Sequence, residues 1–398
     1  MRLGDRLPDE VVLKYYLYQA SVSFGFFSPV FTLFLLYRDL SYTEIALLSS
    51  QHAVLTVVGE VPTGYVGDRI GRRNSLVVSN AAMALSIAGF VVASAFAEFM
   101  VLYALWSVAL VFRSGSGDAW LYEMLRERLD EGRFTTVRGR GGAVNRAVTV
   151  VTMLAGGALY AVRPELPFVA ATVLFVLGLP VLVSMPKNRQ FVDGDGGLTV
   201  LEALPVLRDR LLSPPLRSVV AYVAVFFALV SVTNAYVQPV ATRVVGLQVS
   251  AMGPLYAAFT LVAAGTSYYA DRLSAWFGAR RAVLLVPPVV AVVLLGSALL
   301  PLLVLPAFFL YRGANAGLRP VVNQFINDNA GDVGRATVLS AASMAYALVR
   351  LPMLVGVGRV ADLRGPLTAV GAVAGLALVL LAAVAFARRL ARARAAAE

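Results

Sequence analysis

The chain lacks most of the side chains on which enzyme chemistry depends. It contains no cysteine and a single histidine, His52. The absence of cysteine excludes disulfides, thiolate metal sites and a cysteine nucleophile. One histidine leaves too few nitrogen ligands for zinc and no histidine pair for proton transfer. The phosphate-binding pattern GxxxxGK, which ATP-driven transport would need, is also missing. We therefore expect no metal, no cofactor and no enzymatic activity.

Charged residues are also scarce, at 14% of the 398 residues, whereas apolar residues make up 59%. An ordinary soluble domain carries about 25% charged residues. Apolar stretches of about 20 residues, long enough to cross a bilayer core of about 30 Å, recur throughout the chain. The net charge of +11 does not indicate nucleic acid, because the arginines are scattered between apolar segments. The composition predicts an all-α polytopic membrane protein.

Hydropathy predicts twelve transmembrane helices in two halves. Residues 1–185 contain the first six and residues 216–398 the last six. Between them, 186–215 is expected to be a cytoplasmic linker with a helix lying on the membrane surface, acting either as a tether or as a regulatory segment. The spans are expected at 13–37, 43–66, 74–96, 98–121, 141–162, 167–185, 216–240, 250–270, 282–300, 302–322, 336–358 and 366–387.

The distribution of basic residues predicts the orientation. Of the 34 lysines and arginines, 24 fall on the side that carries both termini, five on the other side and five within the spans. Basic loops stay in the cytoplasm, so both termini are expected inside a multi-pass protein of the cell membrane. The first ten residues do not resemble a removable leader, and the first span is expected to direct insertion itself. The five arginines within the spans are Arg113, Arg146, Arg312, Arg319 and Arg350.

The two halves share a weak internal repeat. Four matches occur in the same order, and their offset drifts only from 210 to 199 residues. Two homologous six-helix halves predict a substrate pathway at the interface between the repeats. The matched positions are Pro29 with Pro239, Ser41 with Ser250, DRIGRR at 68–73 with DRLSAWFGARR at 271–281, and Arg113 with Arg312.

The segment GYVGDRIGRR at 64–73 resembles the signature loop GxxxDRxGRR of the major facilitator superfamily. A second motif of that family, an arginine in span four with a glycine four residues later, is matched by Arg113 and Gly117. The resemblance covers essentially the whole chain. It implies two pseudo-symmetric six-helix bundles, a central cavity, alternating access and a monomer. The matching loop residues are Gly64, Asp68, Arg69, Gly71, Arg72 and Arg73.

The loop is expected to form a gate. Asp68 is placed to face the positive N-terminal end of another helix, and in the family this is the eleventh span. Arg72 could pair with an acid at the inner end of span four, either Asp118 or Glu123. Such contacts would hold the outward-facing state and break on inward opening. The alternative is an ordinary basic turn without a gating role.

Glu60 and Arg113 are candidates for proton coupling. The only carboxylates placed inside the predicted spans, away from their edges, are Glu60 and Asp118, and each is costly there unless paired or protonated. Glu60 and Arg113 are expected at similar depths in the membrane. A contact that changes with conformation would let conformation control proton affinity. The alternative is a static structural pair.

Polar residues of the spans are candidates for lining the central cavity. Arginines in the second half predict a cationic cavity that favours anionic or polar substrates, although they could instead only brace helices. The aromatic and amide residues could equally pack or lie at the membrane interface. The cavity candidates are Tyr15, Tyr18, Gln19, Phe26, Asn234, Tyr236, Gln238, Arg312, Asn315, Arg319, Tyr346 and Arg350.

Together these features predict a secondary transporter whose partners are a small-molecule substrate, protons and the lipid bilayer, and not nucleic acid. We expect proton-coupled efflux of small organic compounds. Drug and proton antiporters of the family usually carry GPxxGG in span five, where only Gly156 and Gly157 remain, so the direction is open. The alternatives are uptake of an anionic or polar metabolite and, in another class, a lipid scramblase or a membrane-embedded enzyme.

Overall fold

The computed structural model describes residues 9–128, 131–188, 216–270, 272, 278–329 and 335–395, and all regular structure among them is helical. The expected linker at 186–215, with its surface helix, lies outside these residues from 189 onward. The first half contains α1 (Glu10–Ser21), α2 (Phe31–Tyr37), α3 (Tyr42–Ile70), α4 (Arg72–Val92), α5 (Phe96–Arg128), α6 (Phe134–Val162) and α7 (Leu166–Ser184). The second half contains α9 (Leu216–Asn234), α10 (Val237–Arg243), α11 (Met252–Tyr268), α13 (Ala279–Leu299), α14 (Val304–Asn329), α15 (Arg335–Arg364) and α16 (Pro366–Ala395).

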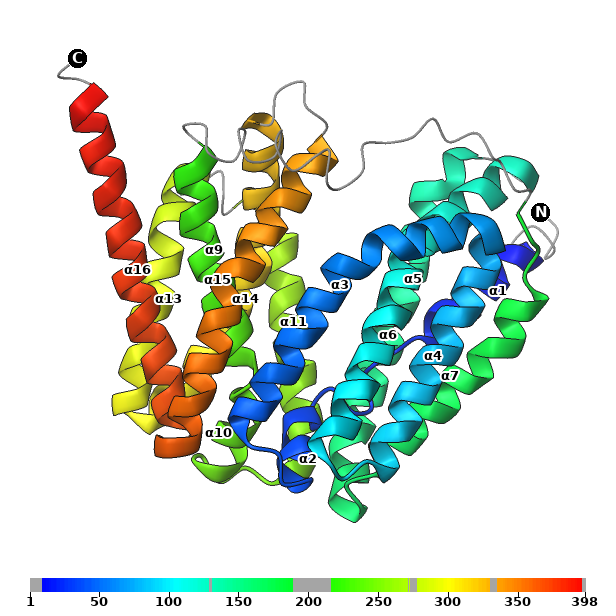
Figure 1. The fold of residues 1–398 in the computed structure, drawn as a ribbon, viewed down its shortest axis with the longest axis horizontal. Coiled ribbons are helices and arrows are strands. Elements are labelled where there is room, and N and C mark those ends of the chain that lie inside the picture. Colours follow the sequence, from blue (N-terminus) through cyan, green and yellow to red (C-terminus); the bar gives the residue numbers. More distant parts are fainter. Residues whose placement is uncertain are drawn as a thin grey trace. The chain divides into compact units, whose positions relative to one another are not determined.

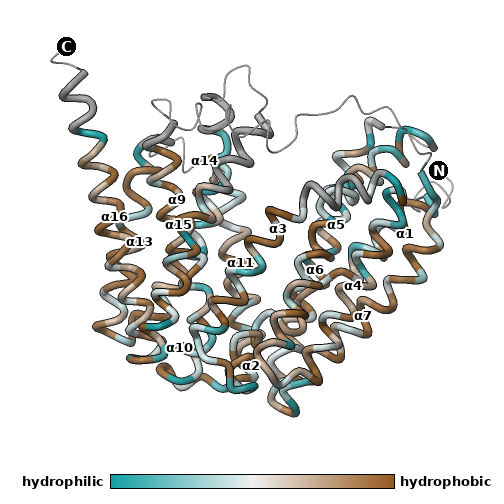
Figure 2. The backbone as a smooth tube through the Cα atoms, viewed as in Figure 1, coloured by the Kyte–Doolittle hydropathy of each residue, from teal (hydrophilic) through white to brown (hydrophobic). Residues whose placement is uncertain are grey.

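These helices follow the twelve predicted spans in order. Seven of the described helices are long and apolar enough to cross a membrane, and the bent pair α9 and α10 makes up to eight. Figure 2 shows mostly apolar residues along α7 and along α16 as far as its basic C-terminal turns. The predicted break between spans nine and ten is present, because a short 3-10 helix at Pro301–Leu303 separates α13 from α14.

The chain forms two compact units, drawn in Figure 1. Unit 1 contains residues 1–38, 48–197 and 249–254, and unit 2 contains 39–47, 198–248 and 255–398. The first turns of α3 therefore belong to unit 2, although the rest of that helix belongs to unit 1. In the same way, the start of α11 belongs to unit 1. In both halves it is the start of the second span that is grouped with the other unit. This agreement is expected from the internal repeat.

The expectation that span one is a continuous helix is wrong. Helix α1 ends at Ser21 and α2 begins at Phe31, with non-helical chain between them. Pro29 lies in this gap and has no N–H to donate to a helix. Gly25 lies so close to Thr149 and Thr152 of α6 that any Cβ would collide with them. Span seven bends by 44° between α9 and α10, and Pro239, the repeat partner of Pro29, lies in α10 just after the bend.

Backbone geometry repeats between the halves. Gly71 precedes α4 with φ 86°, and Gly278 precedes α13 with φ 76°. Asp39, before α3, has φ 60°, and Gly246 has φ 80° at the equivalent place before α11. Left-handed backbone is costly for most residues and easy for glycine. The paired conformations extend the sequence repeat to the loops.

Close helix contacts in each unit depend on glycine. In unit 1, a Cβ on Gly156 would fall on the carbonyl oxygen of Phe26, and one on Gly157 would lie 2.8 Å from the carbonyl oxygen of Ser250. In unit 2, a Cβ on Gly358 would lie 3.0 Å from the carbonyl oxygen of Tyr42. Small residues let membrane helices approach closely enough for dense packing.

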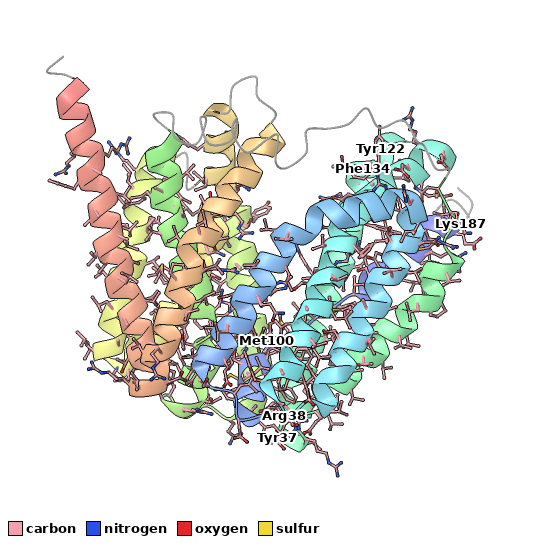
Figure 3. All side chains as sticks on the ribbon, in the orientation of Figure 1. Tyr37, Arg38, Met100, Tyr122, Phe134 and Lys187 are labelled. Carbon is pink, nitrogen blue, oxygen red and sulfur yellow. The ribbon has the colours of Figure 1, made fainter. Side chains whose placement is uncertain are left out.

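The two ends of unit 1 carry different labelled residues in Figure 3. Tyr37 and Arg38 lie at one end, whereas Tyr122, Phe134 and Lys187 lie at the opposite end. Arg38 donates to the carbonyl oxygen of Val91 at 2.6 Å and to Glu165 at 3.2 Å. The distribution of basic residues assigns Arg38 to the outer side and Lys187 to the inner side. The two residues lie at opposite ends of unit 1, as this assignment predicts.

The contact at Gly156 gives a stability prediction. Gly156→Ala should lower the free energy of unfolding by about 1–3 kcal/mol, because α6 and the backbone at Phe26 must move apart to make room for the methyl group. Gly142→Ala is the matched control on α6, since its Cβ would meet nothing within 4 Å. Thermal unfolding of the purified protein in detergent measures both. Equal melting temperatures for the two variants would contradict the packing argument.

Candidate functional site

Residues of unit 1 line a half-open cavity of about 620 Å³. Its walls come from α1, the chain after it, α3, α5 and α6. Apolar helix faces and a few convergent polar groups are the usual lining of a small-molecule site. The lining residues are Tyr18, Gln19, Val22, Phe24, Thr56, Leu110, Arg113, Ser114, Gly117, Asp118, Asn145 and Thr149.

Arg113 is the only arginine of this lining. Its guanidinium carbon lies 5.5 Å from the centre of the Phe24 ring, in the non-helical part of span one. A cation over an aromatic face is attracted by the ring quadrupole, and this stabilises a charge that has left bulk water. Among the described residues no carboxylate forms an ion pair with Arg113. Its predicted partner, Glu60, belongs to α3, but the side chain of Glu60 lies outside the described part of the structure.

The two candidate acids for Arg72 have different partners. Arg138 of α6 donates to both oxygens of Asp118, at 2.8 and 2.7 Å. Arg72 lies 3.6 Å from Glu123, between Nε and Oε1. Glu123 is therefore the acid beside Arg72, because Asp118 already has a bidentate guanidinium partner. No group of three His, Asp or Glu residues could hold a metal ion within the described chain.

The remaining loop residues lie around the junction of α3 and α4. Gly71 provides the left-handed turn, and Arg69 is exposed. Gly64 and Asp68 are in α3, but nothing is described of their side chains. Arg73 donates to the carbonyl oxygens of Val183 and Met185 at the end of α7, at 3.0 and 3.3 Å.

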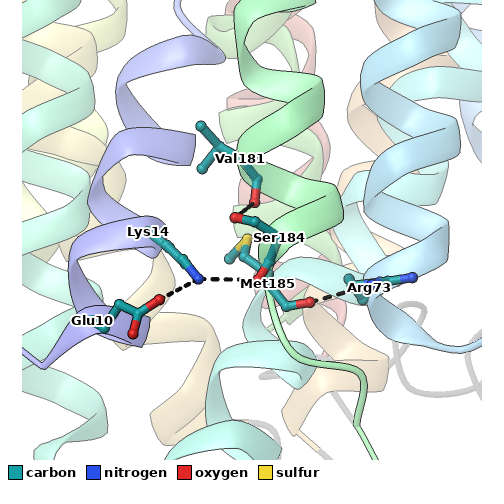
Figure 4. A network of polar contacts seen from close by, with 6 residues as sticks. All are labelled: Glu10, Lys14, Arg73, Val181, Ser184 and Met185. Atoms are coloured by element: carbon teal, nitrogen blue, oxygen red, sulfur yellow. Dashed lines mark hydrogen bonds and ion pairs between the residues drawn. The ribbon is translucent and has the colours of Figure 1, made fainter.

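Figure 4 shows this end of α7 held by two cations. Lys14 of α1 donates to the carbonyl oxygen of Ser184 at 3.2 Å and pairs with Glu10 at 2.6 Å. Arg73 reaches Met185 from α4. Terminal carbonyls of a helix lack intrahelical partners and carry partial negative charge, so cations stabilise them. The signature loop is thereby fixed to the last helix of the first half.

The cavity candidates of span one separate into two pairs. Tyr18 and Gln19 line the cavity. Tyr15 instead stacks on Trp120, with ring centres 6.3 Å apart, and is buried. Phe26 contributes its backbone to the contact with Gly156. Tyr15 and Phe26 therefore lie outside the lining of this cavity.

Unit 2 holds Arg312 inside a cage of aromatic rings. Its guanidinium carbon lies 5.3 Å from the ring centre of Tyr256, 5.2 Å from Phe259 and 5.6 Å from Tyr311. Its Nε also donates to the hydroxyl of Tyr311 at 3.1 Å. Arg312 is the repeat partner of Arg113, so both halves place an arginine over aromatic rings at the same position.

Two amides from the second half's first span extend this polar cluster. Tyr311 donates to Asn234 at 2.8 Å, and Gln238 donates to Tyr256 at 3.0 Å. Both contacts tie the α9 and α10 region to rings around Arg312. Tyr236 is buried and lies against Tyr42, with ring centres 5.7 Å apart.

Arg319 and Arg350 lie against α9. The guanidinium carbon of Arg319 is 5.6 Å from the centre of the Phe227 ring, which also contacts Tyr346 at 5.2 Å. Nη1 of Arg350 donates to the hydroxyl of Ser231 over a long 3.4 Å. Its Nε is buried without a hydrogen-bond partner in the described structure, and so is Oδ1 of Asn315.

Asp362, which hydropathy did not single out, caps the start of α3 within unit 2. Its carboxylate accepts from the backbone N–H groups of Tyr42, at 2.7 Å, and Thr43, at 3.1 Å, and from the Thr43 hydroxyl. These first N–H groups of a helix have no intrahelical acceptor. A carboxylate there is favoured by hydrogen bonds and by the helix dipole.

Other residues of the sites were also missed from sequence. Asn145 and Thr149 line the cavity one helical turn apart, and Arg138, about two turns before Asn145 on the same helix, neutralises Asp118. A polar stripe at spacings of three or four residues along span five was the available signal. Asp362 lies just beyond the predicted end of span eleven, and no local pattern marks a cap on a distant helix.

Comparison with known proteins decides the family. A model of the Major Facilitator Superfamily matches residues 18–352, which is most of the chain. The chain belongs to the Major Facilitator Superfamily. A curated relative, the uncharacterized MFS-type transporter YxaM of Bacillus subtilis (strain 168), is 24% identical over 177 residues. That stretch spans less than half of either protein, 44% of this chain and 43% of the relative.

Solved structures confirm the twelve-helix fold of two pseudo-symmetric bundles. The nucleoside transporter NupG has a TM-score of 0.72 at 12% identity, covering 94% of this chain and 96% of that one. A bacterial homologue of the human lysosomal transporter Spinster has a TM-score of 0.71 at 15% identity, covering 94% of each chain. A D-xylose–proton symporter has a TM-score of 0.62 at 14% identity, covering 93% and 95%.

Membership of the superfamily confirms the coarse functional prediction. Its members are membrane transporters and not enzymes, and they bind small-molecule substrates. The chain is therefore a multi-pass membrane protein of a transporter family. The cavity of unit 1 and the arginines of unit 2 are the polar features that a solute could use.

The cage around Arg312 predicts a structural role for this residue. Arg312→Gln should lower the free energy of unfolding by about 1–3 kcal/mol, because it removes the cation from three rings and a hydrogen bond to Tyr311. Arg312→Lys should recover part of this loss. The control is Arg146→Gln, at an exposed arginine of α6. Thermal unfolding in detergent measures all three, and an unchanged Arg312→Gln melting temperature would refute the role.

Proposed function

We propose that this protein exports a small organic solute by alternating access, in exchange for protons. The observation that carries the proposal is the cavity in unit 1, where Tyr18, Gln19, Arg113 and Asn145 gather between otherwise apolar helices. Its volume of about 620 Å³ lies within the range of about 300–1,000 Å³ that small-molecule sites occupy. Polar groups at this depth are costly unless they meet protein, water or a solute.

Export is favoured by the glycine contacts of α6. Gly156 and Gly157 remain from the antiporter motif that the family resemblance supplies. They allow the approach of the Phe26 backbone and of the Val249–Ala251 turn, whose Ser250 oxygen would lie 2.8 Å from a Gly157 Cβ. The two remaining glycines thus permit close packing here, although Thr152 and Met153 stand where glycine and proline would be.

Glu60 is proposed as the proton carrier, with Arg113 as the residue that tunes it. A Cβ on Gly59, the neighbour of Glu60, would lie 3.5 Å from Val111, two residues before Arg113. This contact supports the prediction that Glu60 and Arg113 lie at similar depths. A carboxyl group in apolar surroundings favours its protonated form, whereas a nearby guanidinium favours the ionised form. Movement of α3 against α5 would therefore change the proton affinity.

Helix α3 is proposed as the element that couples the two units. Its first turns belong to unit 2, where Asp362 caps them, and the rest belongs to unit 1. Asp68, near its other end, is proposed to hold the outward-facing state, with Arg72 and Glu123 supporting the same junction. Release of residues 39–47 from unit 2 must break the Asp362 hydrogen bonds. We propose that Asp362 holds the inward-facing state.

The protein is proposed to act as a monomer in the cell membrane with both termini in the cytoplasm. The orientation is supported by the distribution of basic residues, with 24 assigned to the inner side and five to the outer side. A scramblase of the same fold is the rival from another class. Lipid-probe redistribution in proteoliposomes without solute transport would favour that rival.

Reconstitution tests transport and coupling together. Proteoliposomes should accumulate or release a solute from a screened panel, and an imposed pH gradient should increase the rate. Glu60→Gln should abolish the response to the gradient, because the amide cannot carry a proton. Asn145→Ala is the control for the cavity. It should lower the affinity for the solute, but transport should still respond to the pH gradient. A Glu60→Gln variant that responds fully to the gradient would remove Glu60 from the coupling.

Asp362, which caps the start of α3, and Asp68, near its other end, should have opposite effects on access. The chain has no cysteine, so Asn145→Cys introduces a unique label into the cavity. Asp362→Asn should speed its reaction with an impermeant maleimide added outside, because the proposed inward-facing latch is weakened. Asp68→Asn should slow that reaction and sharply reduce transport without blocking insertion.

The matched control for both is Glu98→Gln. Glu98 also accepts backbone N–H groups at a helix start, from Ser94 at 2.7 Å and Ala95 at 3.0 Å, but entirely within unit 1. Its removal should leave the labelling rate unchanged. Equal rates for wild type and Asp362→Asn would refute the proposed latch.

A further inference from the structure

We propose that unit 2 binds the anionic group of the solute on an arginine face, formed by Arg319 and Arg350 against Phe227, Ser231 and Asn234 of α9. The ligand class is a small organic anion that carries a carboxylate, phosphate or sulfonate. The inference rests on the proposed transport function and names its substrate class.

The contacts on α9 follow one helical face. Phe227, Ser231 and Asn234 are separated by four and then three residues, which places them on the same side of the helix. Arg319 contacts Phe227, Arg350 contacts Ser231, and Tyr311, bonded to Arg312, contacts Asn234. At about 1.5 Å per residue these three contacts are about 6 and 4.5 Å apart along α9.

Among the described residues of the second half, no carboxylate pairs with the arginines of this face. The seven described helices there contain two carboxylates, Asp328 and Asp362. Asp328 is nine residues beyond Arg319, about 14 Å along α14. Asp362 is twelve residues beyond Arg350 and accepts hydrogen bonds from α3. Neither Arg319 nor Arg350 forms an ion pair with a described residue of the chain.

Arg350 has hydrogen-bond donors to spare. A guanidinium has five N–H donors in a planar fork that matches a carboxylate or phosphate in bidentate geometry. In the described structure Arg350 donates one hydrogen bond, to Ser231 at 3.4 Å, and its Nε is buried without a partner. A buried donor without an acceptor is costly. An anion that accepts from this fork would remove that cost.

Arg319 indicates that the face is open to water. It is exposed although it lies inside a predicted span. An arginine facing lipid at mid-membrane costs about 2.5–3.5 kcal/mol even by the lowest scales. The exposed side of Arg319 must therefore meet water or a solute. Arg312 differs, because three rings and the Tyr311 hydroxyl enclose it, and we assign it a bracing role.

Binding to the purified protein tests the anion site directly. The probes are succinate, inorganic phosphate and ethanesulfonate, with uncharged succinamide as the matched neutral compound. Thermal unfolding in detergent is followed against probe concentration at constant ionic strength, so that screening does not change. The variants are Arg350→Gln, Arg350→Lys and Arg319→Gln. Arg359→Gln, at an exposed arginine of the same helix as Arg350, is the control.

At least one anion should raise the melting temperature saturably, and succinamide should not. Arg350→Gln and Arg319→Gln should weaken the apparent affinity roughly 10- to 100-fold, as the loss of a hydrogen bond to a charged group does. Arg350→Lys should retain part of the affinity, because it keeps the charge but not the fork. No saturable shift with any of the three anions, or equal affinities for Arg350→Gln and Arg359→Gln, would overturn the inference.

A solute screen in proteoliposomes separates this inference from the proposed function. Transport of neutral or cationic solutes alone, without anion binding, would leave the transporter standing and exclude the anion site. Saturable anion binding that Arg350→Gln abolishes, with no transport of any solute, would support the site and refute the proposed transport. Anion transport that requires Arg350 would support both.

Discussion

The structure depends on one constraint: a charge or free backbone group inside an apolar helix bundle must find a partner or water. Unit 1 meets it by pairing, with Arg138 on Asp118, and by a cavity around Arg113. The described helices of the second half contain two acids, Asp328 and Asp362, and the arginines there meet aromatic rings and hydroxyl groups instead. The halves share a fold and a repeat, but they differ in how their charges are balanced.

The break in span one follows from the same constraint. Its backbone leaves the helix only where other groups replace the lost hydrogen bonds. The N–H of Gly25 donates to the Ser23 hydroxyl, which in turn lies 3.0 Å from Thr149 and 3.2 Å from Thr152. Phe24, in the same segment, supplies the ring beneath Arg113. The irregular segment therefore forms part of the cavity wall.

The fold was predictable because apolar length is a local property, and every expected span coincides with a helix or a broken pair. Hydropathy does not register the break at Gly25 and Pro29, since both suit an apolar stretch. Site partners were less predictable. The sequence narrowed the possible partners of Arg72 to two acids. The choice of Glu123 depends on the structure, in which Arg138 already binds Asp118. Asp362 acts on a helix start more than 300 residues away in sequence, at Tyr42, which no local pattern encodes.

The charge of the solute bears on the direction of transport. An interior-negative potential of 100 mV is worth about 2.3 kcal/mol for each elementary charge that crosses the membrane. This potential drives an anion outward and a proton inward, so it contributes to both movements when the two are exchanged. Uptake of the same singly charged anion with one proton would be electroneutral, so only the pH gradient would drive it. With Glu60 as the single proposed proton carrier, the membrane potential therefore favours export of an anion over its uptake.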